Sequence, residues 1–447
     1  MTEKRRFLLS LAGLALPIVL QNLLSQAIGM ADTFMLSAVG QTQLAAVSLA
    51  NQLLFVLNLF FAGLTGSSAT MLAQYLGKGD GTRVRRIFTM ACAVSEGVCA
   101  LFSLAAVFAS RGVMRLLTPD AALIEEGSAY LRIVGVSYLF MGVSQIYLVL
   151  LKARQESHRS MAISVLTLAL NLALNAVFIF GLLGMPALGI RGVAMATCIA
   201  RAVELLVCLA DAARRGTIVP TTRFEQALLR DFVRICAPLT AQGFVWGGAM
   251  AVISAIMGRL GEDMVAAYAV AAAVQNIATA ASFGLGEAGS ILLSKALGAG
   301  DFARARREAD LLIRSAVAFG VLGCGIMLAA EGVVTPLFHL TGSAPAYLRV
   351  AYKILSVNTI FASITNTMLC GVFPAGGNTR YGLLLDGAVM WSMVALGAAA
   401  FVLRLHPVLV FVVLSVDELT KTPLVLLRYR KGTWLCNITR NQEEEAV

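Results

Sequence analysis

Twelve long apolar segments, separated by short polar loops, dominate this sequence. They span residues 7–36, 45–73, 87–110, 126–151, 160–183, 189–210, 232–258, 265–294, 309–331, 347–373, 381–403 and 407–427. A helix needs about 20 apolar residues to cross a bilayer, and each segment is long enough. Hydrophobic residues make up 58% of the 447 residues and charged residues only 13%. We therefore predict an all-α integral membrane protein with twelve transmembrane helices, and we exclude a soluble enzyme, a disordered chain and a disulfide scaffold.

Cysteine and histidine usage gives no sign of a metal site. The 8 cysteines form no CxxC pair, and the 3 histidines have no regular spacing. Free cysteine in an apolar run packs as a small hydrophobic residue. The net charge of +10 is read as loop charge on one side of a membrane, not as a nucleic-acid surface. We expect no metal, no cofactor and no nucleic-acid partner.

Basic residues alternate from one loop to the next, which sets the orientation. With the N-terminus inside, clusters such as Lys4–Arg6 and Arg83–Arg86 face the cytoplasm. The opposite loops carry only these basic residues: Arg111, Arg115, Arg191, Arg259 and Arg404. Cytoplasmic loops are the ones enriched in Lys and Arg. The apolar run from Phe7 to Leu36 is too long for a signal peptide, so it is the first span, and both termini are expected in the cytoplasm.

The two halves of the chain repeat one another. A shift of 221 residues without gaps places Pro17 on Pro238, Gln21 on Gln242, and the loop 76–86 on 297–307. Six spans in each half place the start of both halves on the same side of the membrane. We expect two pseudo-symmetric six-helix lobes, at 1–214 and 231–430, joined by a cytoplasmic linker at 215–230 and followed by a cytoplasmic tail at 431–447.

Polar side chains inside the spans of the first half are candidates for function, because each costs free energy in a membrane. Asp32 lies in the outer half of span 1, where an interfacial helix end is the alternative. Asn171 and Asn175 are four residues apart, so they share one face of span 5. Interhelical hydrogen bonding for packing alone would explain them equally. Thr197 in span 6 is a weaker candidate, since threonine can bond its own backbone.

The second half contains Glu287 in span 8 and Asp386 in span 11. Glu287 follows closely spaced glycines, so it would line a cavity or pair with a neighbouring helix. Asp386 lies six residues after Arg380, and an interfacial ion pair between them is the alternative. Asp417 and Glu418 precede Lys421 by four and three residues, which favours a local ion pair over a site.

Known motifs for catalysis or ATP binding are missing from the sequence. No GxxxxGK[ST] pattern occurs, so the chain has no ATP-binding engine of its own. No GxSxG or HExxH occurs either. Transport would therefore be driven by an ion gradient or run passively.

Four segments together give the chain a resemblance to a known family. They are 16–23 with 31–34 in span 1, the loop 74–80, its copy 296–301, and Gly376–Arg380. In combination they resemble the MATE (multidrug and toxic compound extrusion) transporters over nearly the whole chain. Span 7 has no acidic residue, which resembles the DinF-like bacterial branch of that family.

The resemblance implies an antiporter of the bacterial inner membrane that exports organic, often cationic, compounds while H⁺ or Na⁺ enters. Its cation or proton site would use Asp32, Asn171, Asn175 and Thr197. Many relatives have an acid where this chain has Asn175, so a single carboxylate favours proton over Na⁺ coupling.

Further roles follow from the same interpretation. Gln21, Asn22, Glu287 and Asp386 are candidate substrate contacts, and Pro17, which has no backbone N–H, is a candidate hinge. We expect a monomer in the lipid bilayer that acts on small organic substrates. The alternative is a lipid-linked oligosaccharide flippase of the same superfamily, which would need more cations within its spans. A membrane-embedded enzyme is the third reading, and it lacks any nucleophile–base pair in the spans.

Overall fold

The computed structural model describes residues 3–216, 225–337 and 342–440, and within these ranges its regular structure is helical throughout. The expected all-α class is confirmed. Residues 217–224, in the expected linker, and 441–447, in the expected tail, lie outside the described residues.

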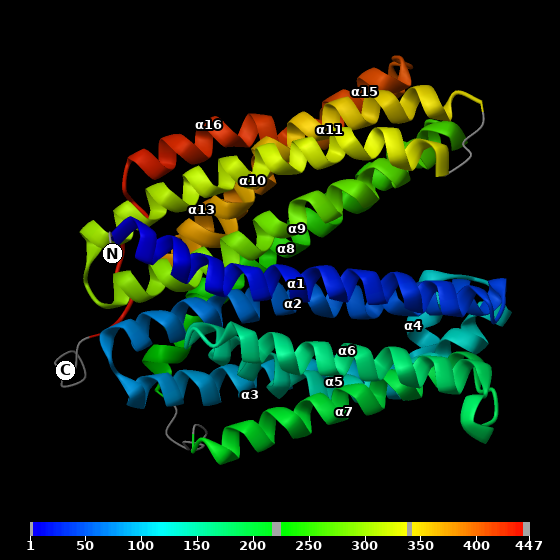
Figure 1. Ribbon diagram of the computed structural model, residues 1–447. Coiled ribbons are helices and arrows are strands. Elements are labelled where there is room, and N and C mark those ends of the chain that lie inside the picture. The colour runs from blue at the N-terminus through cyan, green and yellow to red at the C-terminus, as the bar shows by residue number, and fades with distance from the viewer. Residues whose placement is uncertain (1–2, 217–224, 338–341, 441–447) are drawn as a thin grey trace. The chain divides into compact units, whose positions relative to one another are not determined.

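The described residues of the first half form seven α-helices, which Figure 1 shows in blue to green. They are α1 (Glu3–Ser37), α2 (Gln41–Lys78), α3 (Gly81–Phe108), α4 (Ser110–Leu117), α5 (Ala121–Ala153), α6 (Ser157–Phe180) and α7 (Gly189–Arg214). A short turn, η1 (Leu182–Gly184), precedes α7. Helix α5 packs against α3, α6 and α7, so it is central among them.

The second half begins with long helices and ends with interrupted ones. The long helices are α8 (Gln226–Arg259), α9 (Glu262–Gly298), α10 (Phe302–Leu337) and α11 (Ala344–Asn366). The rest are η2 (Thr367–Val372), α12 (Phe373–Ala375), α13 (Thr379–Leu385), η3 (Asp386–Met390), α14 (Trp391–Val402), α15 (Pro407–Ser415) and α16 (Asp417–Arg430). Both η2 and η3 are π-helical turns inside otherwise α-helical spans.

Among the described residues, 11 helices are long and apolar enough to cross a membrane. The expected twelfth span, 407–427, is divided at Val416, which has φ −97° and ψ 9°. Asp417 and Glu418 then occupy the first turn of α16, where negative charge is favourable because the helix N–H groups there are free. The twelve expected spans are therefore present when α15 and α16 are taken as one broken span.

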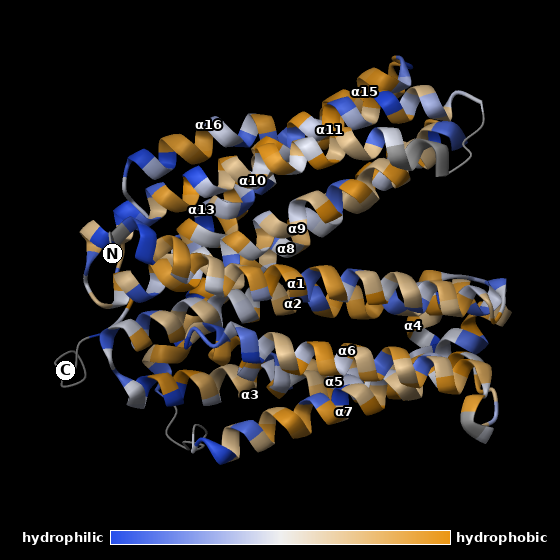
Figure 2. Ribbon diagram, in the orientation of Figure 1, coloured by the Kyte–Doolittle hydropathy of each residue, from blue (hydrophilic) through white to orange (hydrophobic). Residues whose placement is uncertain are grey.

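Hydropathy follows the helices as a membrane protein requires. Figure 2 shows hydrophobic residues along the lengths of the helices and hydrophilic residues at ends such as the start of α1. Large apolar side chains such as Phe34, Phe108 and Leu116 are exposed, which suits a surface covered by lipid.

Backbone contacts divide the chain into two compact units. The first unit is Leu20–Leu72 with Asp80–Phe232, and the second unit is Met1–Val19, Ala73–Gly79 and Val233–Val447. The start of α1 belongs to the second unit because Phe7, Leu11 and Ile18 are buried in its core. The units thus differ from the sequence halves at the beginning of α1 and the end of α2. The lobe boundaries expected from the sequence stay a prediction.

Two glycines related by the 221-residue shift bring the ends of α2 and α9 together. A Cβ atom at Gly77 would overlap the carbonyl oxygen of Lys295, and one at Gly298 would overlap that of Gln74. Gln74 and Lys295 are themselves related by the same shift. The contact is therefore reciprocal, and the equivalent ends of α2 and α9 lie next to each other.

The C-terminal tail is held against this meeting point. Trp434 is 1% exposed and its ring stacks on Tyr429, with centroids 5.6 Å apart. Gln74 Nε2 donates to the carbonyl of Ala375 at 2.7 Å, and Gln74 Oε1 accepts from the N–H of Ile438 at 2.9 Å. Lys78 Nζ donates to the carbonyl of Arg440 at 2.6 Å. The described part of the tail is thus an ordered element.

Candidate functional site

Asp32 of α1 and Asn175 of α6 are joined by a hydrogen bond in the first unit. Asn175 Nδ2 donates to Asp32 Oδ1 at 2.8 Å. Asn175 is fully buried and Asp32 is half-buried. Among the described residues, Asp32 has no ion-pair partner, and the side-chain oxygen of Asn175 has no donor. A buried acceptor without a donor is costly, so this oxygen is suited to accept a hydrogen bond from a neighbouring protonated group.

The hydrogen bonds continue from Asn175 to two further expected site residues. Asn175 Nδ2 also lies 3.4 Å from Asn171 Oδ1, and Asn171 Nδ2 donates to Thr197 Oγ1 at 3.3 Å. Thr197 in turn donates to the carbonyl of Val193 at 3.0 Å. The structure therefore brings all four expected residues into one chain of contacts, while their role in ion binding stays a prediction.

Gln21, a candidate substrate contact, lies on the same pair of helices. Its Nε2 donates to Ser164 Oγ on α6 at 2.9 Å, and its Oε1 is buried without a donor in the described part of the chain. Asp32 follows Gln21 by the same number of residues as Asn175 follows Ser164. The helices α1 and α6 therefore run parallel here. Sequence reasoning missed Ser164, although its spacing from Asn171 and Asn175 places all three on one helix face.

Tyr130 is a second residue near Asp32 that sequence reasoning missed. Its ring belongs to α5, is 4% exposed, and lies within electrostatic range of Asp32. Its hydroxyl donates to Asn51 Oδ1 of α2 at 3.3 Å. Neither Tyr130 nor Asn51 is charged, so the sequence does not single them out. The position of Tyr130 near Asp32, and its contact with Asn51, become visible only from the packing of α1, α2 and α5.

Pro17 lies inside α1, which remains one helix from Glu3 to Ser37. The boundary between the two units follows it closely, after Val19. Proline removes one backbone hydrogen bond from a helix interior, so this is the part of α1 where bending costs least. Asn22 is half-buried on the next turn.

Glu287 lies in the second unit, where the glycines around it allow close packing. A Cβ at Gly284 would overlap the side chain of Val19, and one at Gly371 would approach the carbonyl of Gly286 at 2.9 Å. Glu287 itself is half-buried and within electrostatic range of Cys370 in η2. The glycines just before Glu287 are therefore closely packed, while the expectation that Glu287 itself faces the cleft or a helix interface stays a prediction.

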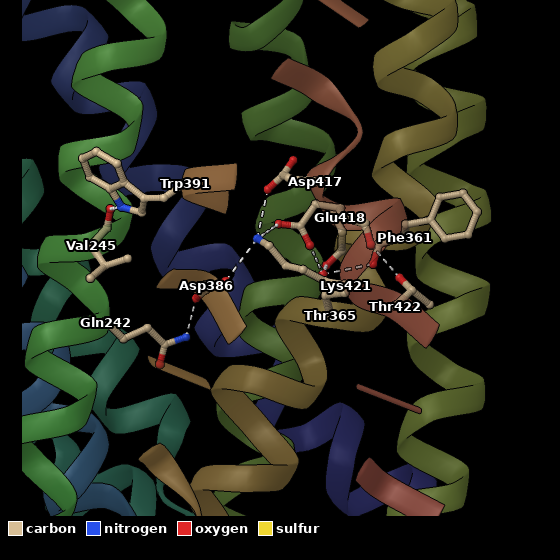
Figure 3. A network of polar contacts seen from close by, with 11 residues as sticks. Gln242, Val245, Phe361, Thr365, Asp386, Trp391, Asp417, Glu418, Lys421 and Thr422 are labelled. Atoms are coloured by element: carbon tan, nitrogen blue, oxygen red, sulfur yellow. Dashed lines mark hydrogen bonds and ion pairs between the residues drawn. The ribbon is translucent and has the colours of Figure 1, made fainter. Parts of the chain in front are cut away.

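One interpretation of the sequence expected an ion pair between Asp386 and Arg380, and that expectation is wrong. Asp386 lies 3.1 Å from Lys421 Nζ and accepts from Gln242 Nε2 at 2.6 Å (Figure 3). The local pairs of Lys421 with Asp417 and Glu418 are confirmed, each at 2.9 Å. Asp386 thus belongs to a buried charge cluster that the sequence showed only in part.

Glu204 of α7 is a buried acid that sequence reasoning also missed. It is 2% exposed and pairs with Arg201 at 2.9 Å. It also accepts from Ser144 at 2.9 Å and from Gln145 at 3.0 Å. Because its charge is paired and hydrogen-bonded, we read it as a structural link between α5 and α7.

Comparison with protein families gives a match over most of the chain. The family model described as MatE matches residues 17–177 and 238–399. The two matches begin at positions related by the 221-residue shift, so they coincide with the internal repeat.

Individual relatives are distant but cover nearly the whole sequence. The uncharacterized transporter YisQ of Bacillus subtilis is 21% identical over 438 residues, 95% of each chain. The multidrug resistance protein NorM of Burkholderia vietnamiensis is 25% identical over 391 residues, 86% of this chain and 84% of its own. The structure of the MATE transporter VcmN of Vibrio cholerae superposes with a TM-score of 0.87 at 18% identity, covering 97% of this chain and 100% of that one.

Proposed function

The chain belongs to the MatE family, and we propose on this premise that it is a proton-coupled antiporter exporting organic, often cationic, compounds by alternating access. Members of this family are membrane transporters and not enzymes, so the established part is transport. Coupling ion, direction, substrate and the DinF-like branch are the parts that we propose.

One observation carries the choice of the proton. The acid of α1, Asp32, has as its neighbour the neutral amide of Asn175 at 2.8 Å. A Na⁺ ion in a membrane needs several oxygen ligands and a compensating negative charge, whereas a proton needs a single carboxylate. The unsatisfied oxygen of Asn175 would accept a hydrogen bond from protonated Asp32, so either protonation state finds a partner.

The proposed cycle couples protonation of Asp32 to the conformation of α1. One proton supplies about 1.4 kcal/mol per pH unit and about 2.3 kcal/mol per 100 mV. That is enough to shift two states that differ by a few kcal/mol. Pro17, near the boundary of the two units, is the proposed hinge for this change.

Organic compounds are the proposed cargo because relatives such as NorM are named for multidrug resistance. Gln21, Asn22 and Glu287 are the proposed substrate contacts. Asp386, the fourth candidate, is already engaged by Lys421 and Gln242, which leaves it less free to contact a substrate. We propose that the protein acts as a monomer.

Both termini are proposed to face the cytoplasm of a bacterial inner membrane. The alternation of basic loops supports this, and so does the docking of the tail. Arg440 contacts Lys78 and Tyr75, at the end of α2 expected to face the cytoplasm. A reporter that is active only in the cytoplasm should be active when fused to the C-terminus, and a reporter that is active only outside the cytoplasm should be inactive there.

The test uses purified protein in liposomes, with pH and Na⁺ gradients imposed separately and a fluorescent organic cation as substrate. We expect a pH gradient alone to drive export and a Na⁺ gradient alone to give none. Export driven only by Na⁺ would overturn the choice of ion. Translocation of a lipid-linked oligosaccharide, without any effect of either gradient, would favour the flippase.

A further inference from the structure

Lys421 is buried in the second unit among three carboxylates. It is 2% exposed, and its Nζ atom lies 3.1 Å from Asp386, 2.9 Å from Asp417 and 2.9 Å from Glu418. Figure 3 shows the three acids converging on the ammonium from η3 and from the first turn of α16. These four residues are called the Lys421 cluster.

The Lys421 cluster has more negative than positive groups. If every group were ionised, three carboxylates would face one ammonium. Among the described residues, no other Lys or Arg forms an ion pair with these acids. Uncompensated charge is costly inside an apolar helix bundle, and burial commonly neutralises one member instead. Two negative charges would then be uncompensated, so burial favours the uptake of at least one proton by the cluster.

The surroundings of the three carboxylates indicate which of them takes up the proton. Asp386 accepts from both Lys421 and Gln242, which favours its ionised form. Asp417 is the first residue of α16 and lies 2.9 Å from Lys421, and the free N–H groups of the first turn favour negative charge on it as they do on Glu418. Glu418 also contacts Lys421, but it differs from both acids in one respect: its second oxygen contacts the hydroxyl of Thr365 on α11, a group that can either donate or accept a hydrogen bond.

The Thr365 hydroxyl has one proton and several neighbours. Its oxygen lies 3.1 Å from the carbonyl of Phe361 and 3.3 Å from that of Ala362, so the proton can be donated to its own helix. Thr365 Oγ1 donates to Glu418 when Glu418 is ionised. When Thr365 donates to its own helix instead, its lone pairs can accept a hydrogen bond from protonated Glu418. The Thr365 hydroxyl can therefore partner Glu418 in both protonation states, as an exchangeable proton requires.

Other titratable groups lie around the Lys421 cluster on the neighbouring helices. Tyr268 of α9 is within electrostatic range of Asp417. Cys370 of η2 is within electrostatic range of Asp386, Glu418 and Lys421, and Glu287 of α9 is within range of Cys370. None of these groups carries a positive charge, so none of them compensates the excess negative charge of the cluster.

We propose that the Lys421 cluster is a second proton-binding site, in which Glu418 carries the exchangeable proton and Lys421 is a fixed counter-ion. On protonation, a carboxylate oxygen of Glu418 forms an O–H bond, and on release that proton returns to water. The site is separate from Asp32, and its occupancy does not require that the proposed transport cycle be correct.

A proton fits this site better than a metal cation does. The ammonium of Lys421 already occupies the point where the three carboxylates converge, so it would repel a second cation. Among the described residues, no three acidic, thiol or imidazole groups are placed to hold a metal ion. The occupant must therefore be small enough to sit on a single carboxylate.

The backbone around the cluster is irregular in each helix that contributes to it. Asp386 begins the π-helical turn η3, Thr365 lies just before the π-helical turn η2, and Val416 interrupts the last span. Such turns and broken helices occur frequently at functional sites. They give the cluster a structure that can rearrange when its charge changes.

Infrared difference spectroscopy of the purified protein tests the proposal, using the carbonyl stretch of a protonated carboxyl during pH titration. The background is Asp32→Asn, which removes the carboxyl of the first site. We expect one protonated-carboxyl band to remain in Asp32→Asn and to disappear in Asp32→Asn/Glu418→Gln. Glu262→Gln, at an exposed position in α9, is the control that should leave the band in place.

A second variant keeps the test decisive if Glu418→Gln does not fold. Thr365→Val retains the shape of the side chain but removes its hydroxyl, so the carbonyl band should shift to higher wavenumber. A band that changes in neither variant would overturn the proposal. Continued export by Asp32→Asn would contradict the proposed function instead, and it would not alter the infrared result.

Discussion

The amide of Asn175 donates a hydrogen bond to the carboxylate of Asp32 over 2.8 Å, joining α6 to α1. The same amide reaches Asn171, whose own amide reaches Thr197. The acid of α1 is therefore held by a chain of neutral groups. Loss or gain of one charge at Asp32 changes the total charge of the site, which is the requirement for a switch driven by a single ion.

Asp32→Asn is the first test of that switch. Asparagine preserves the size of the side chain and can still bond Asn175, so the protein should fold and insert normally. It cannot exchange a proton, so export driven by a pH gradient in liposomes should fall to the level of empty vesicles. Glu125→Gln, at an exposed position of α5, is the matched control and should export at the parental rate. Undiminished export by Asp32→Asn would place the coupling elsewhere.

Asn175→Asp should change the ion that the site accepts. It places a second carboxylate beside Asp32 and removes the donated hydrogen bond. Two adjacent carboxylates cannot both remain ionised in an apolar site unless a cation lies between them. We expect export by this variant to be stimulated by a Na⁺ gradient, to which the parent does not respond. The comparison is the initial export rate with and without Na⁺ at equal pH, and an unchanged rate would contradict it.

Hydropathy and repeats predict this fold well because membrane helices must be long, apolar and hydrogen-bonded within themselves. Hydropathy does not predict the break at Val416, because a window of about 19 residues averages over a local change in backbone angles. In the first unit, Asp32, Asn171 and Asn175 stand out because polar groups are rare in spans. In the second, the sequence shows the proximity of Glu418 to Lys421 but not that of Asp386, because that contact depends on how two separate helices pack.

Gly298→Leu should destabilise the protein strongly. A side chain there overlaps the carbonyl of Gln74, which belongs to the backbone of α2 and cannot move aside. Overpacking of this kind costs about 1–3 kcal/mol and sometimes more. The melting temperature of the detergent-purified protein should fall clearly below the parental value. Gly325→Leu, at a helical glycine with open space around it, is the control and should melt near the parental temperature.

Trp434→Ala should show that the tail contributes to stability. Trp434 is 1% exposed and stacks on Tyr429, and truncating a buried aromatic residue costs about 3–5 kcal/mol. The variant should melt at a lower temperature and become sensitive to proteolysis after α16. Trp246→Ala removes a tryptophan that is 44% exposed, so it should change the melting temperature little. Equal effects of the two substitutions would show that the tail does not stabilise the second unit.

If the Lys421 cluster and Asp32 both load a proton in each cycle, the number of coupled protons is measurable. At zero membrane potential, each coupled proton allows one further factor of about ten in substrate accumulation per pH unit. With a gradient of about one pH unit and the potential clamped by valinomycin and equal K⁺, the parent should then reach about 100-fold substrate accumulation at steady state. Glu418→Gln should reach only about 10-fold, because its second site can no longer change charge, whereas Glu262→Gln should match the parent. A tenfold limit in the parent itself would mean that the second proton stays bound throughout transport, which would make the Lys421 cluster a fixed structural element of the second unit.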